Sequence, residues 1–202
     1  MGDLYEDLDQ VFSKDRQVEK IRQNNYSEYI DYYLPSDTTE LESGKLSDSF
    51  VFNRSCFIMD VNVAGILNGK YYPEEYYGNE GFFDPEKLVF ENEGIYHDVS
   101  GEENEYFYRV YSYEDRYLTY FVSRQLIFYG YAYEEDLVGL SSRILLMAKG
   151  TTIRQDDVIS NFSLRDEIDF EKKQVNLFET IMPVNGNVND LMIPSQEEEE
   201  AQ

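Results

Sequence analysis

Two residue types that carry much of enzyme chemistry are nearly missing from this sequence. Cys56 is the only cysteine and His97 is the only histidine. A single cysteine excludes an internal disulfide and a zinc site of the cysteine type, and a single histidine excludes a cluster of imidazole ligands. The phosphate-binding loop, the dinucleotide-binding glycine motif, the EF-hand loop and the G-x-S-x-G motif are absent as well. We therefore predict no catalytic residue, no metal ligand and no cofactor, and we do not expect an enzyme.

Positive charge is also scarce. Lysine and arginine together number 17 against 41 aspartates and glutamates, which gives a formal net charge of -24. Because phosphate binding needs clustered cations, nucleic acid is not predicted as a partner. An acidic surface suits a basic protein partner or a multivalent cation, and it also keeps a protein soluble without any binding role. The acidic segments "RDEIDFE" and "RQDD" would bind calcium only if they folded toward each other.

Long apolar runs are the third absence. No run approaches the roughly 18 apolar residues of a membrane-spanning helix, and no signal peptide opens the chain. The sequence therefore indicates either a cytoplasmic protein or a chain shown after removal of a targeting segment. Its 202 residues include 42% hydrophobic and 16% aromatic residues, enough to bury a core. We predict one domain over residues 1–182 and a flexible acidic tail over residues 183–202.

Residues 1–34 have the spacing of helices. Apolar side chains recur three, four and seven residues apart, with charges between them, at Leu4, Leu8, Val11, Phe12, Val18 and Ile21. The stretch "YSEYIDYYL" repeats this spacing up to Pro35, which predicts a second helix. The following "SDTTELESGKLSDS" is predicted to be a polar connection.

From Phe50 onward the apolar period changes from 3.6 to 2. "SFVFNRSCFIMDVNVAGIL" is rich in β-branched and aromatic residues and ends at Asn68-Gly69, a hairpin signal. Further strands are predicted at residues 87–91, 106–113, 117–129, 143–149 and 174–182, with short turns between several of them. "RQDDVISNFSL" fits a short helix or a strand. The predicted fold class is α+β, with N-terminal helices followed by a mainly β region over residues 50–182 that forms an antiparallel meander.

Residues 106–123, "YFYRVYSYEDRYLTYFVS", predict a hairpin that is unusually rich in tyrosine. A turn centred on Glu114-Asp115 sets Tyr108 opposite Phe121. One face then carries Phe107, Tyr111, Leu118, Tyr120, Val122 and Leu126, which we predict to face the core. The other carries Tyr106, Tyr108, Ser112, Tyr117, Thr119 and Phe121.

The second face is too aromatic for an ordinary solvated surface and too rich in hydroxyl groups for a dry core. Tyrosine combines a large contact area with a polar tip, which suits a protein interface. We predict a partner-binding site with two parts, an aromatic platform of Tyr106, Tyr108, Tyr117 and Phe121 and an acidic rim of Glu114, Asp115, Glu134, Glu135 and Asp136. The alternative is that the N-terminal helices cover this face. A three-residue turn would also shift the register and mix the two faces.

The order of "YSEYIDYYLPSD", "FVFNRSCFIMDVNVAGILNGKYYP" and the tyrosine hairpin resembles the TipC family of immunity proteins of streptococci and their relatives. The resemblance covers residues 26–182. It implies a curved sheet that binds a type VII-secreted toxin of the LXG class, which attacks lipid II, and that blocks the toxin's active site. It also implies an extracytoplasmic location through an N-terminal membrane tether, which this sequence lacks. The family is not enzymatic, so no catalytic residue is carried over.

The sequence thus predicts an immunity protein whose partner is a toxin with a cationic contact surface. Two alternatives remain open. A structural or assembly subunit would self-associate through the same aromatic face, and a cation-dependent enzyme would be built from the acidic residues. The expected location is extracytoplasmic through a tether, with a cytoplasmic location as the alternative.

Overall fold

The computed structural model describes residues 4–13, 21–68 and 84–163, all within one compact unit, Met1–Ile168. The predicted domain boundary at residue 182, the strand at residues 174–182 and the acidic tail lie outside the described residues. The fold class is confirmed as α+β, because a short N-terminal helix precedes two antiparallel sheets.

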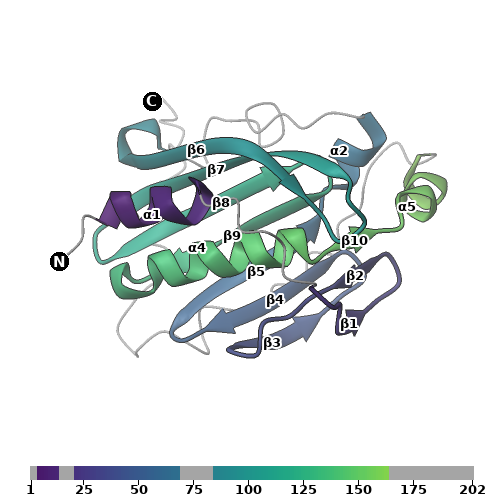
Figure 1. Ribbon diagram of the computed structural model, residues 1–202, viewed down its shortest axis with the longest axis horizontal. Coiled ribbons are helices and arrows are strands. Elements are labelled where there is room, and N and C mark those ends of the chain that lie inside the picture. The colour runs from purple at the N-terminus through teal and green to yellow at the C-terminus, as the bar shows by residue number, and fades with distance from the viewer. Residues whose placement is uncertain (1–3, 14–20, 69–83, 164–202) are drawn as a thin grey trace, which may run out of the picture. The chain divides into compact units, whose positions relative to one another are not determined.

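The larger sheet has seven strands in the order β3-β4-β5-β9-β8-β7-β6, and every neighbouring pair is antiparallel. It consists of two meanders, β3 to β5 and β6 to β9, which join where β5 pairs with β9 (Figure 1). The strands are β3 (Thr38–Ser43), β4 (Ser47–Phe52), β5 (Ser55–Val61), β6 (Leu88–His97), β7 (Glu103–Tyr113), β8 (Arg116–Ser123) and β9 (Leu126–Ala132).

The register predicted for the tyrosine hairpin is confirmed. Tyr108 pairs with Phe121, and Glu114-Asp115 form the turn between β7 and β8. Glu114 has a φ of 45°, the left-handed conformation that a tight turn of this kind needs. The predicted strand at residues 117–129 is two strands, because Arg124 and Gln125 turn the chain back between β8 and β9.

Two helices lie on one face of the seven-stranded sheet, α1 (Leu4–Ser13) and α4 (Glu134–Lys149) (Figure 1). The helix α4 has acidic residues in its first turn and Lys149 in its last, which is favourable to the helix dipole. Its residues Leu137, Leu140 and Ile144 are fully buried at helical spacing. They pack into the main core with Phe50, Phe57 and Phe128 of the sheet. This helix replaces the strand predicted at residues 143–149, which was wrong.

The remaining helices are short. They are α2 (Val63–Asn68), the 3₁₀ turn η1 (Pro85–Lys87) and α5 (Gln155–Phe162). A hairpin turn was predicted at Asn68-Gly69, but the residues that lead up to it, Val63–Asn68, form the helix α2 and not a strand. The segment "RQDDVISNFSL", which fitted either a short helix or a strand, contains the helix α5. Among the described residues, no helix is both long and apolar enough to span a membrane.

A second, three-stranded sheet consists of β1 (Asn25–Tyr26), β2 (Ile30–Tyr32) and β10 (Thr152–Ile153), in the order β1-β2-β10. The strands β1 and β2 lie in the stretch predicted to be the second helix, and β3 and the start of β4 occupy most of the predicted polar connection, so both predictions were wrong. The cause is tertiary. Asp31 of β2 pairs with Thr152 of β10, a partner that lies far away in the sequence.

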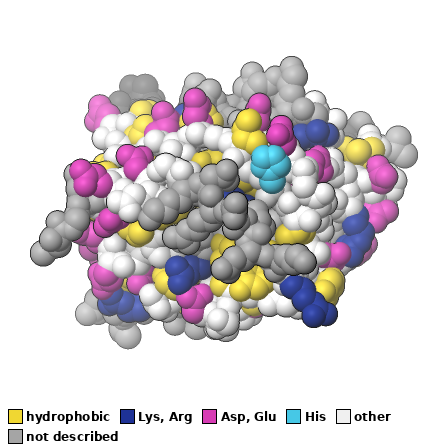
Figure 2. All heavy atoms as spheres, in the orientation of Figure 1, with side chains coloured by type: hydrophobic (Ala, Val, Ile, Leu, Met, Phe, Trp, Pro, Cys, Tyr) yellow, Lys and Arg dark blue, Asp and Glu magenta, His cyan; other side chains and the backbone are white. Residues whose placement is uncertain are grey.

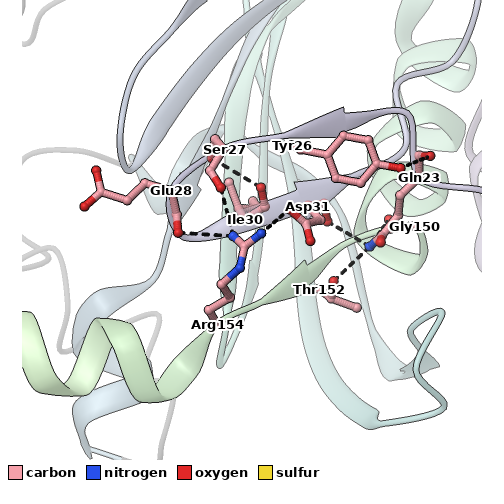
Figure 3. Close-up of polar contacts among 9 residues, drawn as sticks. All are labelled: Gln23, Tyr26, Ser27, Glu28, Ile30, Asp31, Gly150, Thr152 and Arg154. Carbon is pink, nitrogen blue, oxygen red and sulfur yellow. Dashed lines mark hydrogen bonds and ion pairs between the residues drawn. The ribbon is translucent and has the colours of Figure 1, made fainter.

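Polar side chains hold this small sheet together (Figure 3). The Arg154 guanidinium donates through Nη1 to the backbone oxygen of Ser27 at 2.8 Å and through Nη2 to the Asp31 carboxylate at 2.7 Å. The Gln23 amide donates to the backbone oxygen of Asp31 and to the Thr152 hydroxyl, both at 2.9 Å. These bonds join residues that precede the strands of the seven-stranded sheet in the sequence to residues that follow them. Their role is therefore structural.

Candidate partner-binding surface

The side chains predicted to form an aromatic platform lie inside the protein. Tyr106, Tyr108 and Phe121 are buried in the main core, and Tyr117 is partly buried against it. The ring of Phe12 on α1 lies 4.6 Å from that of Tyr108, centroid to centroid, and the Tyr108 hydroxyl is 2.6 Å from Ser141 Oγ on α4. A partner that binds the folded surface does not reach these three buried rings, because α1 and α4 cover them.

The two faces of the hairpin are therefore the reverse of the main prediction, and the alternative, in which N-terminal helical residues cover the tyrosine face, is correct for α1. The helix-covered core includes Tyr106, Tyr108, Phe121 and also Leu126. The face predicted to point to the core instead forms two smaller clusters on the opposite side of the sheet. One consists of Tyr111, Tyr113, Leu118 and Tyr131, and the other of Tyr120, Val122, Ile127, Phe107 and Tyr129. Both faces are apolar, so alternation alone does not identify the one that the helices cover.

Four of the predicted acidic residues come together at one end of the sheet. Glu114 and Asp115 are exposed at the β7–β8 turn, and Glu134 and Glu135 are exposed in the first turn of α4. Tyr133 connects the two places, because it accepts a hydrogen bond from the Arg116 guanidinium at 3.3 Å. Asp115 and Glu135 form ion pairs with Arg116 and Arg54. The two arginines neutralise part of the negative charge at this end.

The fifth predicted residue, Asp136, does not belong to an exposed rim. Its side chain is buried, and its two carboxylate oxygens accept hydrogen bonds from Asn53 Nδ2 at 2.9 Å and Ser55 Oγ at 3.0 Å. Asn53 is in the turn between β4 and β5, with a φ of 51°. Asp136 therefore fastens this turn to the start of α4, which is a structural role.

Replacing Asp136 by alanine is expected to lower the free energy of unfolding by about 1–3 kcal/mol, because the buried Ser55 hydroxyl and the Asn53 amide lose their acceptor. The neighbouring Glu135→Ala is the matched control. It removes an exposed ion pair with Arg54 and is expected to cost less than about 1 kcal/mol. Urea unfolding followed by circular dichroism measures both. Equal unfolding midpoints for the two variants would contradict the structural role of Asp136.

A second acidic surface lies on the β6–β7 hairpin, and sequence reasoning did not predict it. Along β6, the alternate residues Glu91, Glu93, Ile95 and His97 are exposed, and Glu103 and Glu105 are exposed on β7. We call these six residues the hairpin strip. They share one face because their positions alternate with the inward-facing residues of the same strands.

The register fixes the geometry of the hairpin strip. Ile95 lies opposite Glu105, and His97 lies opposite Glu103 with His97 Nε2 3.2 Å from the carboxylate. Ile95 is 59% exposed, which makes it one of the most exposed large apolar residues in the described part of the chain. Figure 2 shows His97 in cyan beside magenta acidic side chains and yellow hydrophobic ones. The strip thus presents one large apolar side chain among four glutamates and His97.

The turn at the tip of this hairpin is held by Asp98. Its Oδ1 accepts hydrogen bonds from the backbone amides of Ser100 at 2.8 Å and Glu102 at 3.0 Å, and from the Ser100 hydroxyl at 2.6 Å. Gly101 takes a φ of 87°, which a residue with a side chain adopts only under strain. These contacts fix the strand ends, so the hairpin strip is a preformed surface.

The signal for the hairpin strip was present in the sequence. Residues 91–97 alternate between outward and inward positions, which is the period of a strand, but the predicted strand stopped at residue 91. The segment "GIYHDVSG", residues 94–101, is rich in the glycine, aspartate and serine that are typical of turns. Only its second half, from Asp98 to Gly101, turns the chain.

Two further carboxyl groups lie within the sheet, Asp48 on β4 and Asp60 on β5. Burial raises the pKa of both, because little water is available to solvate the ionised form. Asp48 Oδ1 accepts a hydrogen bond from the backbone amide of Gly44 at 3.0 Å. In the part of the chain that the structure describes, no group of three or more histidine, cysteine, aspartate or glutamate side chains is arranged to hold a metal ion.

The raised pKa of Asp60 predicts a pH dependence. In the folded state Asp60 keeps its proton to a higher pH than in the unfolded state, where its pKa is about 3.9, so its contribution to stability falls as pH rises through this window. Asp60→Asn is therefore expected to gain stability relative to the parent between pH 4 and pH 7. Denaturant unfolding at both pH values measures this difference. The exposed Asp9→Asn is the control, and a parent-to-variant difference that is the same at both pH values for Asp60→Asn would contradict the prediction.

Comparison with family models, curated proteins and solved structures finds no match to this chain.

Proposed function

We propose that this protein is an immunity protein that binds a secreted antibacterial toxin and blocks the toxin's active site. The observation that carries the proposal is the hairpin strip, where Ile95 stands exposed among Glu93, Glu105 and the His97–Glu103 pair. An apolar side chain beside exposed glutamates suits a partner with a complementary cationic surface around an apolar depression.

The charge of the whole chain supports the same kind of partner. A formal net charge of -24 attracts a cationic domain over several ångströms and raises the rate of encounter. Such steering weakens with ionic strength, whereas burial of Ile95 and its neighbours is much less sensitive to salt. The association rate is therefore expected to fall with added salt more steeply than the dissociation rate rises.

The resemblance to the TipC family suggests the finer identity of the partner. On this proposal the toxin is a type VII-secreted protein of the LXG class that attacks lipid II, and the immunity protein acts outside the cytoplasm. The protein itself contributes no chemistry. It acts by occupying the surface through which the toxin reaches its substrate.

Co-purification with the toxin domain encoded beside this protein tests the proposal. The expected result is a stoichiometric complex in size-exclusion chromatography together with loss of toxin activity. Failure to form a complex with that domain at micromolar concentration would overturn the immunity function.

Charge reversal at two places tests where the toxin binds. Glu93→Lys with Glu105→Lys alters the hairpin strip, and Glu114→Lys with Glu134→Lys makes the same change in charge at the opposite end of the sheet. All four side chains are exposed, so both variants are expected to fold. The first variant is expected to lose at least about tenfold in affinity, and the second much less. The reverse order would place the binding site at the rim predicted from sequence.

Self-association is the second candidate function, because β6 is an edge strand among the described residues. Pairing of two β6 edges would bring Glu91 and Glu93 of each copy close to those of the other. Like charges that face each other across a strand pair are destabilising. The edge is thus better suited to a cationic partner than to a second copy, and light scattering is expected to give a monomer. A dimer that dissociates on Glu93→Lys would favour the assembly function instead.

A further inference from the structure

The strand β6 forms one edge of the seven-stranded sheet. Within the described residues it pairs only with β7. An edge strand leaves a row of backbone amide and carbonyl groups without a partner strand, which is a template for an added strand. The question is whether this edge is protected and, if it is not, which kind of segment it fits.

The two edges of the sheet differ in regularity. The strand β3, at the other edge, has six residues, and a bulge between Glu40 and Glu42 interrupts it in the middle. The strand β6 has ten residues, and its irregularity lies at its start, between Leu88 and Phe90. The pairing is regular from Phe90 to His97. Because a bulge twists an edge and stops further pairing, its bulge protects β3, whereas no bulge interrupts the described pairing of β6 between residues 90 and 97.

Acidic side chains lie on both sides of the β6 edge. On one face are Glu91 and Glu93 of the hairpin strip. On the other face is α1, which contacts β6 (Figure 1). Its residues Glu6, Asp7 and Asp9 are exposed. Successive side chains of a strand point to opposite faces of a sheet, so every second side chain of an added strand would lie on the face of the hairpin strip and meet its glutamates. Ile95, at 59% exposure, offers an apolar contact near the middle of the regular stretch.

We propose that β6 binds an extended cationic segment of a partner protein, which adds to the sheet as a further strand. Backbone hydrogen bonds along residues 90–97 supply the alignment, and lysine or arginine side chains at every second position of the segment meet the acids of the hairpin strip. The inference rests on the proposed function, since it describes how the toxin would be held, but the edge itself is a property of this chain.

A pair of synthetic peptides tests strand addition directly. A short peptide of alternating lysine and valine has the required charge and backbone donors, whereas a peptide of alternating lysine and proline has the same charge but no amide donor on every second residue. The first peptide is expected to bind at least about tenfold more tightly than the second, and to slow amide hydrogen exchange within residues 90–97. Equal affinity for the two peptides would show attraction by charge alone and would overturn the proposal.

A matched pair of substitutions tests the location. Ile95→Lys and Leu41→Lys each introduce a lysine at an exposed apolar residue of an edge strand, on β6 and on β3 respectively. Ile95→Lys is expected to weaken peptide binding at least about tenfold, and Leu41→Lys less than about twofold. Equal effects would overturn the assignment to β6.

The outcome with the toxin domain separates this inference from the proposed function. A toxin complex that is unaffected by Ile95→Lys would keep the immunity function and overturn strand addition at β6. Peptide binding at β6 without any toxin complex would support the edge as a docking site and remove the toxin as its partner.

Discussion

Replacing Tyr108 by alanine is expected to lower the free energy of unfolding by about 3–5 kcal/mol, the usual cost of deleting a buried aromatic ring. The ring is fully buried and packs against Phe12 of α1 and Phe90 of β6. Its loss leaves a cavity between the sheet and both covering helices. For a protein of ordinary stability this is a large fraction of the total, and it appears as a lower midpoint in urea unfolding.

Two control variants show whether the loss of stability comes from the buried ring, from its hydroxyl group, or from the removal of any tyrosine side chain. Tyr108→Phe keeps the ring, and Ser141 still donates to the backbone oxygen of Leu137 at 2.7 Å, so a loss of only about 1 kcal/mol is expected. Tyr26→Ala removes the same atoms from a residue that is 69% exposed and should change stability by less than about 1 kcal/mol. If Tyr108→Ala kept full stability but lost partner binding, the aromatic platform predicted from sequence would be correct and the buried role would be wrong.

Gly130→Ala is expected to cost about 3 kcal/mol, at the upper end of the range for overpacking a core. A Cβ atom at Gly130 would collide with the backbone oxygen of Cys56 and would lie 2.6 Å from Cα of Phe57. These are backbone atoms of β5, so they cannot move aside without separating β5 from β9. That pairing is the one that joins the two meanders of the large sheet.

Gly101→Ala is the control for this substitution. A Cβ at Gly101 meets no atom within 4 Å, but its φ of 87° is unfavourable for a residue with a side chain, which costs about 1–2 kcal/mol. Thermal unfolding of the two variants therefore compares a steric collision with a purely conformational cost. A Gly130→Ala protein as stable as the Gly101→Ala protein would contradict the close approach of β5 and β9.

Local signals in the sequence were sufficient for the tyrosine hairpin. The "YEDR" turn determines the register, and Tyr108 pairs with Phe121 as predicted. The sequence did not determine which face is covered, because Tyr106 and Tyr108 on one face and Tyr111 and Tyr120 on the other are equally aromatic. The choice depends on where α1 and α4 pack, which is a tertiary contact.

One error in the predicted secondary structure also comes from a tertiary contact, and another comes from reading too short a stretch of sequence. Residues 26–33 have helical spacing, but pairing of β2 with β10 forms a strand there instead. The apolar run at residues 143–149 was too short to separate strand from helix. Reading it together with the acids at residues 134–136 and with Leu137 and Leu140 would have indicated the start and the buried face of α4.

The pairing of β5 with β9 also has a consequence during protein synthesis. The ribosome makes β3, β4 and β5 well before β9, so the nascent meander of residues 38–61 must wait with the β5 edge unpaired until residues 126–132 emerge. Contacts between segments so distant in the sequence form slowly, and exposed strand edges promote aggregation in the meantime. Glu40 and Glu42 on β3 and Asp60 on β5 all have acidic side chains, and like charges on neighbouring strands disfavour pairing of this unfinished half of the sheet with a second nascent copy.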